Sequence, residues 1–128
     1  MTREPLEVEC WFLIPLVRDS DRRLHQPLLW RLLEEALSGT WGGWTGPETM
    51  RWGRKQGAVP GGWKPQGSAD PIIDESRKYT VFVPPMKLDD LRSLLKRVAN
   101  SFDQQEILLS IRGRRERIIP APEDGFLG

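Results

Sequence analysis

Carboxylate side chains near two expected strand ends are the first residues whose types suggest chemistry. Asp19 follows the first expected strand, and Asp74 and Glu75 precede a later one. In an antiparallel sheet these positions lie at the same edge, so the carboxylates could approach one another. Paired carboxylates perform acid–base catalysis or bind hard cations, and Arg77 lies beside them in the sequence. The alternative is solvated loop charge paired with neighbouring arginines, which is common on surfaces and contributes little to stability.

Tryptophan and glycine are concentrated in residues 39–75, which we treat as an insertion after the first expected helix. Most of the 12 glycines lie there, together with Trp41, Trp44, Trp52 and Trp63. Indole rings on a loop can stack on a flat ligand, a sugar or a base, and Tyr79 is a further aromatic candidate for this ligand site. The alternative is a packed cap over the sheet, in which each buried indole contributes about 1.5–3 kcal/mol.

Arginines are clustered near the end of the chain, at Arg112, Arg114, Arg115 and Arg117. Guanidinium groups match phosphate geometry, so this run predicts a phosphate or nucleic-acid contact. Glu116 interrupts the run, and the formal net charge of the chain is only +1. The alternative is a charged edge strand that discourages aggregation between sheets. Nucleic acid is therefore the weakest of the partner hypotheses.

The single cysteine and the single histidine, Cys10 and His25, form a further candidate pair. A Cys–His nucleophile needs an exposed thiol of lowered pKa, whereas Cys10 falls in the middle of an expected strand and is typical of an inert core residue. One cysteine permits neither an internal disulfide nor a cysteine-based zinc site within one chain. The sequence also contains no Gly-x-Ser-x-Gly, phosphate-loop or zinc-helix motif. We therefore expect no metal and no cofactor.

The elements that must position these residues follow from hydrophobic periodicity. Residues 7–17 predict a central strand with two apolar faces, and a charged loop over 18–23 leads to a helix from Pro27 to Ser38-Gly39. Short strands are expected near 40–45 and 49–55, followed by a long loop over 56–71. Further along, the patterns predict a strand over 76–84, an amphipathic helix over 88–102, and a strand over 106–112 that can continue through 117–119.

This order predicts an α+β protein with the ferredoxin-like βαββαβ arrangement. Two helices would cover one face of a four-stranded antiparallel sheet, with the Gly/Trp-rich loop between the second and third strands. Residues 1–119 would form one domain, and residues 120–128 a flexible tail. The uncovered face would carry Trp11, Leu13, Phe82 and Leu108, and so apolar a face usually needs a partner or a covering loop. We therefore expect a homodimer or higher homo-oligomer through the sheet face.

The chain also resembles small ferredoxin-like proteins that carry a Gly/Trp-rich insertion after the first helix. It is similar to an uncharacterised family with an inward Trp on a helix, then Gly-x-Thr, Gly-x-Trp and an acidic residue that leads into a strand. The matching pieces are Trp30, Gly43-Trp44-Thr45, Gly61-Gly62-Trp63 and Asp74-Glu75-Ser76. The resemblance covers most of residues 8–119 and implies the fold without implying any chemistry.

Three classes of function remain open. We favour a non-catalytic, self-associating module that binds a small ligand under the Trp-rich loop, because the sequence lacks the constellation of any named reaction. The second class is an enzyme that uses Asp19, Asp74 and Glu75 for acid–base chemistry on a small molecule. The third is a weak nucleic-acid or phosphate binder that uses the arginines of 112–117. The polar start and the lack of an apolar run of about 18 residues predict a cytoplasmic protein without a membrane span.

Overall fold

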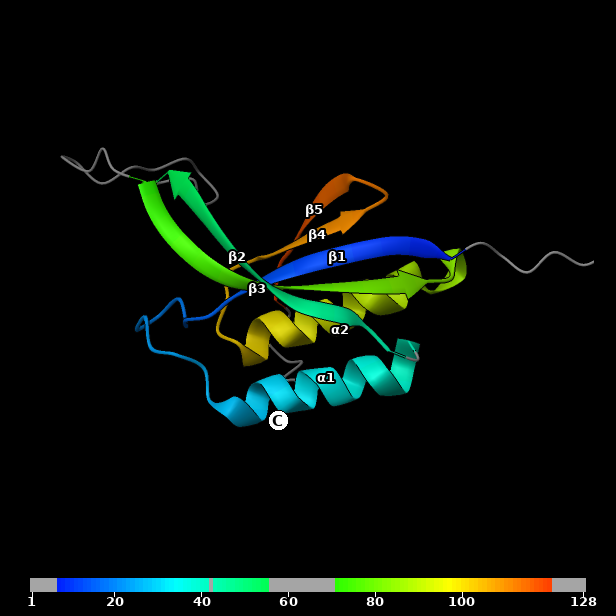
Figure 1. Cartoon of the computed structure of the whole chain (residues 1–128), viewed down its shortest axis with the longest axis horizontal. Coiled ribbons are helices and arrows are strands. Elements are labelled where there is room, and N and C mark those ends of the chain that lie inside the picture. Colours follow the sequence, from blue (N-terminus) through cyan, green and yellow to red (C-terminus); the bar gives the residue numbers. More distant parts are fainter. Residues whose placement is uncertain (1–6, 42, 56–70, 121–128) are drawn as a thin grey trace, which may run out of the picture.

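The fold is one antiparallel sheet with two helices. The structure, a computed structural model, describes residues 7–41, 43–55 and 71–120. In chain order its elements are β1 (Val8–Pro15), α1 (Pro27–Trp41), β2 (Thr45–Lys55), β3 (Pro71–Val83), a short 3-10 helix (Pro85–Lys87), α2 (Leu88–Ser101), β4 (Ile107–Ile111) and β5 (Arg114–Ile118). The strands lie in the order β2-β3-β1-β4-β5, and each neighbouring pair is antiparallel (Figure 1). The α+β class, the antiparallel sheet and the two helices are therefore confirmed.

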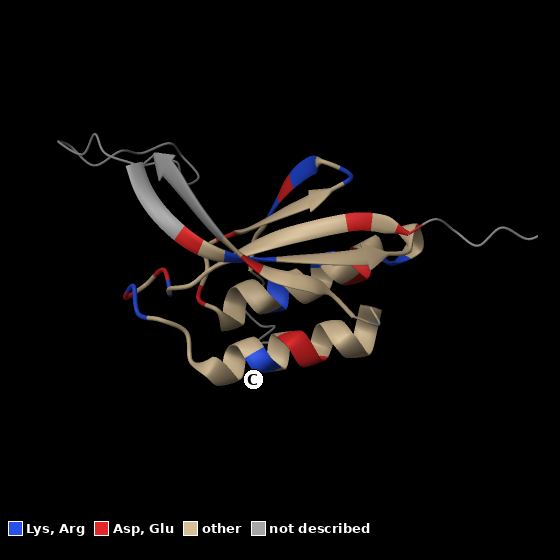
Figure 2. Cartoon of the chain, in the orientation of Figure 1, with Lys and Arg blue, Asp and Glu red and all other residues tan. Residues whose placement is uncertain are grey.

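A fifth strand corrects the expectation of four. The sequence pattern favoured one strand that continues from 106–112 through 117–119, but the chain reverses at Arg112-Gly113 and returns as β5. Both turn residues have positive φ, 52° at Arg112 and 81° at Gly113, as a two-residue hairpin turn requires. The hairpin places Ile107 opposite Ile118 and Ile111 opposite Arg114. Its arginines form a blue patch at the tip of the β4–β5 hairpin (Figure 2).

The Gly/Trp-rich insertion contains more regular structure than its composition predicts. Helix α1 continues past the expected stop at Ser38-Gly39 and ends at Trp41, which packs against the core. A single strand, β2, replaces the two short ones, and β3 begins at Pro71 rather than at residue 76. Each strand supplies the hydrogen-bonding partner that the other needs, because β2 and β3 pair as far as Lys55 opposite Pro71 (Figure 1). The loop expected over 56–71 lies outside the described residues up to position 70.

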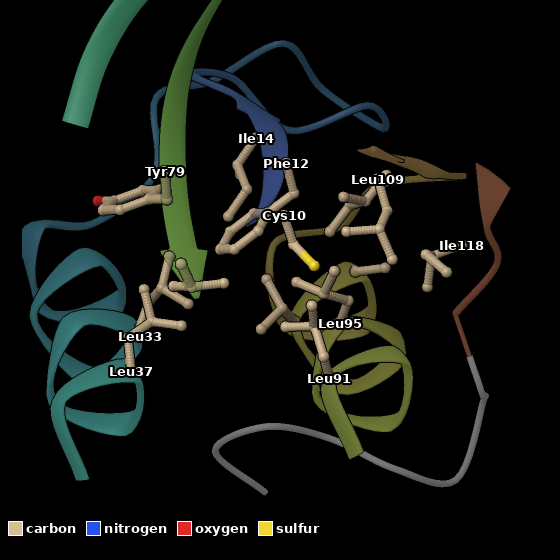
Figure 3. Close-up of a cluster of buried hydrophobic side chains, with 14 of the residues drawn as sticks. Cys10, Phe12, Ile14, Leu33, Leu37, Tyr79, Leu91, Leu95, Leu109 and Ile118 are labelled. Atoms are coloured by element: carbon tan, nitrogen blue, oxygen red, sulfur yellow. The ribbon is translucent and has the colours of Figure 1, made fainter. Parts of the chain in front are cut away.

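The core lies between the sheet and the helices. Alternate residues of β1 point toward the helices, among them Cys10, Phe12 and Ile14, each of them fully buried. They meet the apolar side chains of both helices, as Figure 3 shows for Leu33 of α1 and Leu95 of α2. Helix α2 follows the expected amphipathic pattern, and its buried residues are Leu91, Leu95, Val98 and Ala99. Neither described helix combines the length and apolar character that a membrane crossing needs.

The opposite face of the sheet carries the apolar residues that the sequence placed there. Phe82 is 47% exposed, Trp11 and Leu108 are half-buried, and Leu13 is only 6% exposed. Leu13 lies between Lys78 of β3 and Leu108 of β4 in the strand register. The ammonium group of Lys78 also lies over the Trp11 ring, 4.9 Å from its centroid. Among the side chains on this face whose burial the structure describes, Phe82 is therefore the most open large apolar one.

Candidate functional site

A row of three chemically versatile side chains runs along one face of β3. Residues two apart in a strand point to the same side, so Glu75 and Arg77 share the helix-facing side with the buried Tyr79. Glu75 is exposed, Arg77 is half-buried and Tyr79 is fully buried. The row therefore leads from solvent into the core. Helix α1 brings Glu34 against its inner end.

Glu34 and Tyr79 form the central polar contact of this region. The Tyr79 hydroxyl donates a hydrogen bond to Glu34 Oε2 at 2.7 Å, and Arg77 Nη1 lies 3.9 Å from the same oxygen. Burial, and then the hydrogen bond to the Glu34 carboxylate, raise the pKa of Tyr79 well above its usual value. The phenol therefore remains protonated near neutral pH and acts as a donor.

Aromatic rings surround this polar contact. The Trp44 ring meets Tyr79 edge to face at a centroid distance of 5.7 Å, and Trp44 Nε1 donates to the backbone oxygen of Glu34 at 3.2 Å. The Arg77 guanidinium lies 4.2 Å from the centroid of the Trp30 ring, in the geometry of a cation–π contact. We call Trp30, Glu34, Trp44, Arg77 and Tyr79 the aromatic–carboxylate cluster.

The cluster contains part of the ligand site predicted from the sequence. Trp41 and Trp44 are partly buried and pack against the core, and Trp41 Nε1 is a buried donor without a hydrogen-bond partner in the described structure. Trp52 pairs with Asp74 in the β2–β3 register, and Trp63 lies outside the described residues. Trp44 and Tyr79 are thus the predicted ligand residues that the structure places in direct contact.

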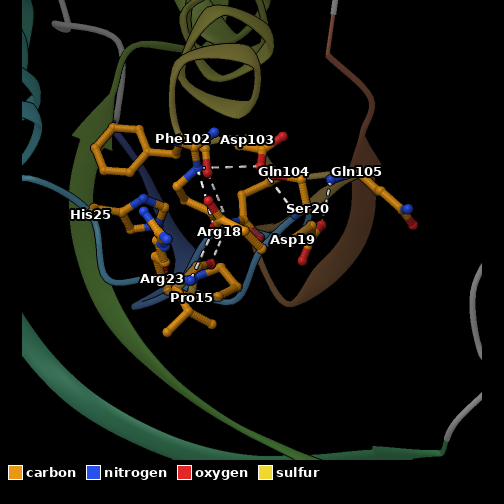
Figure 4. Close-up of polar contacts among 12 residues, drawn as sticks. Pro15, Arg18, Asp19, Ser20, Arg23, His25, Phe102, Asp103, Gln104 and Gln105 are labelled. Carbon is orange, nitrogen blue, oxygen red and sulfur yellow. Dashed lines mark hydrogen bonds and ion pairs between the residues drawn. The ribbon is translucent and has the colours of Figure 1, made fainter.

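Of the predicted acidic residues, Asp19 lies in the β1–α1 loop and Glu75 in β3, while the side chain of Asp74, also in β3, lies outside the part of the chain that the structure describes. The end of β1 does run beside Glu75, whose backbone oxygen accepts a hydrogen bond from Leu16 N–H at 2.9 Å. Asp19, however, is engaged with the loop after α2: its Oδ2 accepts from Gln105 N–H at 2.7 Å, and its own N–H donates to the Asp103 backbone oxygen at 2.9 Å. Asp19 therefore ties two loops together (Figure 4), whereas Glu75 is open to solvent.

Neither Cys10 nor His25 has the environment of a nucleophile or its base. Burial raises the pKa of the Cys10 thiol to about 11, and its sulfur contacts the Val8 backbone oxygen at 3.7 Å. His25 Nε2 lies 2.9 Å from the Pro15 backbone oxygen, so Nε2 carries the proton. Burial lowers the pKa of His25, and its ring packs edge to face against Phe102. His25 is a structural residue of the β1–α1 loop.

Two residues that hold these regions together were missed from the sequence. The helical periodicity did not single out Glu34, although it lies one helical turn after Trp30 and is half-buried. Asp103 accepts hydrogen bonds from both the backbone N–H and the hydroxyl of Ser20, and it lies 3.5 Å from Arg18 Nε. Its positive φ of 52° marks a turn that the helical pattern before it does not reveal.

Comparison with known proteins gives a fold likeness only. No known family matches the chain, and no curated protein is significantly similar to it. Among solved structures, the chain is similar to a phage SAM lyase in complex with S-methyl-5'-thioadenosine, with a TM-score of 0.57 and 13% sequence identity. The likeness covers 93% of this chain and 95% of that one. Within the described residues, no three His, Cys, Asp or Glu side chains gather as a metal site would require.

Proposed function

We propose that this protein is a self-associating, non-catalytic module that binds a small molecule at the aromatic–carboxylate cluster. One observation carries the proposal: Glu34 and Arg77 remain 29% and 35% exposed in their side chains, although aromatic rings surround them. Small-molecule sites combine aromatic walls with a few fixed polar groups. The cluster has this composition: the Tyr79 hydroxyl holds the Glu34 carboxylate, and the Arg77 guanidinium lies over the Trp30 ring.

The ligand class that fits is a flat heteroaromatic ring bearing hydroxyl groups, as in a nucleoside. The half-buried Trp44 indole can stack on such a base. The Glu34 carboxylate accepts hydrogen bonds from hydroxyl groups, and the Arg77 guanidinium donates to ring nitrogens or carbonyl oxygens. The fold likeness to a protein that holds S-methyl-5'-thioadenosine supports this class over a sugar or a lipid.

Tryptophan fluorescence with a panel of nucleosides tests the proposal. We expect S-methyl-5'-thioadenosine or adenosine to change the emission, and Glu34→Gln and Arg77→Gln to weaken binding by about tenfold each, the equivalent of one charged hydrogen bond. Arg31→Gln is the matched control, because Arg31 is an exposed cation on the same helix. An unchanged spectrum with every nucleoside would contradict the proposal, as would equal weakening by the control.

A lyase acting on a sulfonium compound is the second candidate. The observation that favours it is the exposed Glu75 in line with Arg77 and Tyr79, on a fold like that of a SAM lyase. The assay incubates the protein with S-adenosylmethionine and measures release of S-methyl-5'-thioadenosine by chromatography. Release that is lost in Glu75→Gln while nucleoside binding persists would replace the module by an enzyme. No release from the wild type would remove this candidate.

Self-association is proposed through the sheet face that the helices leave open. Phe82 is a large apolar residue of that face with 47% exposure, and Trp11 lies on the neighbouring strand. Native mass spectrometry should show a dimer or trimer for the wild type and a monomer for Phe82→Lys. Met86→Lys provides the control, because Met86 is 74% exposed but belongs to the 3-10 helix. A wild-type monomer would contradict this part of the proposal.

We also infer that β1 to β4 and the two helices follow the ferredoxin-like arrangement, with β5 added at one edge. The strand order β2-β3-β1-β4 and the purely antiparallel pairing support this inference. An experimental structure with a parallel strand pair, or with β5 inserted between two other strands, would contradict it.

A further inference from the structure

The β4–β5 hairpin and the start of α2 enclose a depression lined mostly by arginines. Its volume is about 380 Å³, and its lining residues are Arg92, Ile111, Arg112, Arg114, Arg115 and Glu116. This size falls near the lower end of the range for small-molecule sites. It shares no residue with the aromatic–carboxylate cluster, so it would be a separate site.

The positive charge of this depression is not cancelled by its carboxylate. Arg92 donates to both carboxylate oxygens of Glu116, at 2.9 and 2.8 Å, and to Asp89 at 2.7 Å. This bidentate pair lowers the pKa of Glu116 and satisfies its oxygens. Arg114 and Arg115 are exposed and make no ion pair with the described part of the chain. Their guanidinium groups are therefore available to an anion.

The backbone at Arg112 is an independent indication of function. Its φ of 52° lies in the left-handed region, where a hairpin turn of this length favours Asn or Gly. An arginine here costs backbone energy, and strained residues of this kind cluster at functional sites. The Arg112 N–H also donates to the Glu9 backbone oxygen at 3.3 Å, which ties the turn to β1 and fixes where the side chain starts.

We propose that this corner binds a small ligand with clustered phosphates, in the manner of a pyrophosphate or tripolyphosphate group. Guanidinium groups bind phosphate oxygens in pairs of parallel hydrogen bonds. Arg112, Arg114 and Arg115 form no ion pair with the residues that the structure describes, and three such arginines around one depression match several adjacent phosphates. An extended nucleic acid fits less well, because the net charge is only +1 and three of the four arginines that line the depression belong to one short hairpin. Asp89, which pairs with Arg92 at the start of α2, adds negative charge beside the depression.

Calorimetric titration with tripolyphosphate, at low and at physiological ionic strength, tests the site. We expect one molecule bound per chain, with an affinity that falls as salt rises. The double variant Arg114→Gln/Arg115→Gln should weaken binding by about tenfold or more, the equivalent of one charge-assisted hydrogen bond. The control Lys96→Gln/Arg97→Gln removes the same charge from exposed positions of α2 and should change affinity less than about twofold. Equal loss in both variants would overturn the proposal.

Arg112→Asn separates a ligand-binding role from a structural one. Asn suits a left-handed turn position, so this variant should melt at a temperature no lower than the wild type while it binds tripolyphosphate more weakly by several-fold. Unchanged binding would overturn the role of Arg112, and no detectable binding by the wild type at low salt would overturn the site. Tighter binding of a single-stranded oligonucleotide than of tripolyphosphate would show that the patch serves nucleic acid instead.

Discussion

Replacing Tyr79 by Phe removes one hydrogen bond and leaves the packing of the ring in place. The Tyr79 hydroxyl donates to Glu34 Oε2 at 2.7 Å, and its side chain is fully buried. A hydrogen bond to a charged group contributes about 1.5–3 kcal/mol. Because the Glu34 side chain is 29% exposed, water can replace part of the lost interaction, and we expect about 1.5 kcal/mol. For a domain of this size that corresponds to a fall in melting temperature of roughly 6 °C.

Urea unfolding, followed by tryptophan fluorescence and circular dichroism, measures this loss. The double-mutant cycle with Glu34→Gln isolates the contact, and we expect a coupling free energy of about 1 kcal/mol between the two positions. The matched control is Phe12, whose ring stacks on Tyr79 at 5.6 Å, because Phe12→Leu perturbs packing without touching the carboxylate. If Tyr79→Phe stays within about 0.3 kcal/mol of the wild type, or if the two substitutions are additive, the polar contact does not hold the cluster.

Three further outcomes follow from described contacts. The Ser20 hydroxyl holds the pKa of Asp103 below its usual value, so the stabilisation by the Asp103 carboxylate is present above its unfolded-state pKa and is lost as pH falls through its folded-state pKa. The urea midpoint should therefore decline less steeply with acid in Asp103→Asn than in the wild type, and equal slopes would contradict this. Burial raises the pKa of Cys10 to about 11, so an aromatic disulfide reagent should label the Cys10 thiol at neutral pH only after denaturation. Rapid labelling of the native protein would refute the burial of Cys10. Gly46→Ala places a Cβ 2.7 Å from the Lys78 backbone oxygen at a φ of +106° and should lower the free energy of unfolding, measured in urea, by about 1–3 kcal/mol. In the control Gly39→Ala the added Cβ meets no atom within 4 Å and should be tolerated, so equal stability of the two variants would contradict the close approach at Gly46.

The elements that hydrophobic periodicity predicts well are those with one uninterrupted pattern. In β1 the alternation of Cys10, Phe12 and Ile14 places these side chains on the helix side, where all three are fully buried. In α2 the helical spacing of Leu91, Leu95 and Val98 predicts the buried stripe that the structure has. Each pattern is local, and a single packed face is enough to satisfy it.

The elements that the sequence does not predict depend on distant partners. Strand β2 was expected as two short strands, because Gly and Pro interrupt its local strand propensity, and it runs unbroken from Thr45 to Lys55 because β3 supplies a long antiparallel partner. Strand β5 was expected as a continuation of β4, because an arginine at the first turn position hides the hairpin signal that Asn-Gly would give. Local patterns predict strands, but they do not reveal where a strand finds its pairing partner.

The same limit applies to the candidate site. Tyr79, Arg77 and Trp44 attract attention as aromatic and charged residues near an apolar strand. Glu34 does not, because its importance comes from α1 packing across the sheet, with a separation of 45 residues from Tyr79. Conversely, Asp19 has the residue type of a catalytic acid, but the structure engages its carboxylate with the backbone of Gln105. Residue type indicates possible chemistry, and tertiary contacts decide which residues are free to perform it.

Resonances of the tryptophan indole N–H groups give the most direct test of the proposed ligand site. Titration of labelled protein with S-methyl-5'-thioadenosine should shift the Nε1 signals of Trp30 and Trp44, which border Arg77 and Glu34. The Trp11 signal should stay in place, because Trp11 lies on the opposite face of the sheet. Saturating shifts at Trp30 and Trp44 that are reduced in Arg77→Gln are the expected result. Shifts confined to Trp11, or no shift at any indole, would contradict the account.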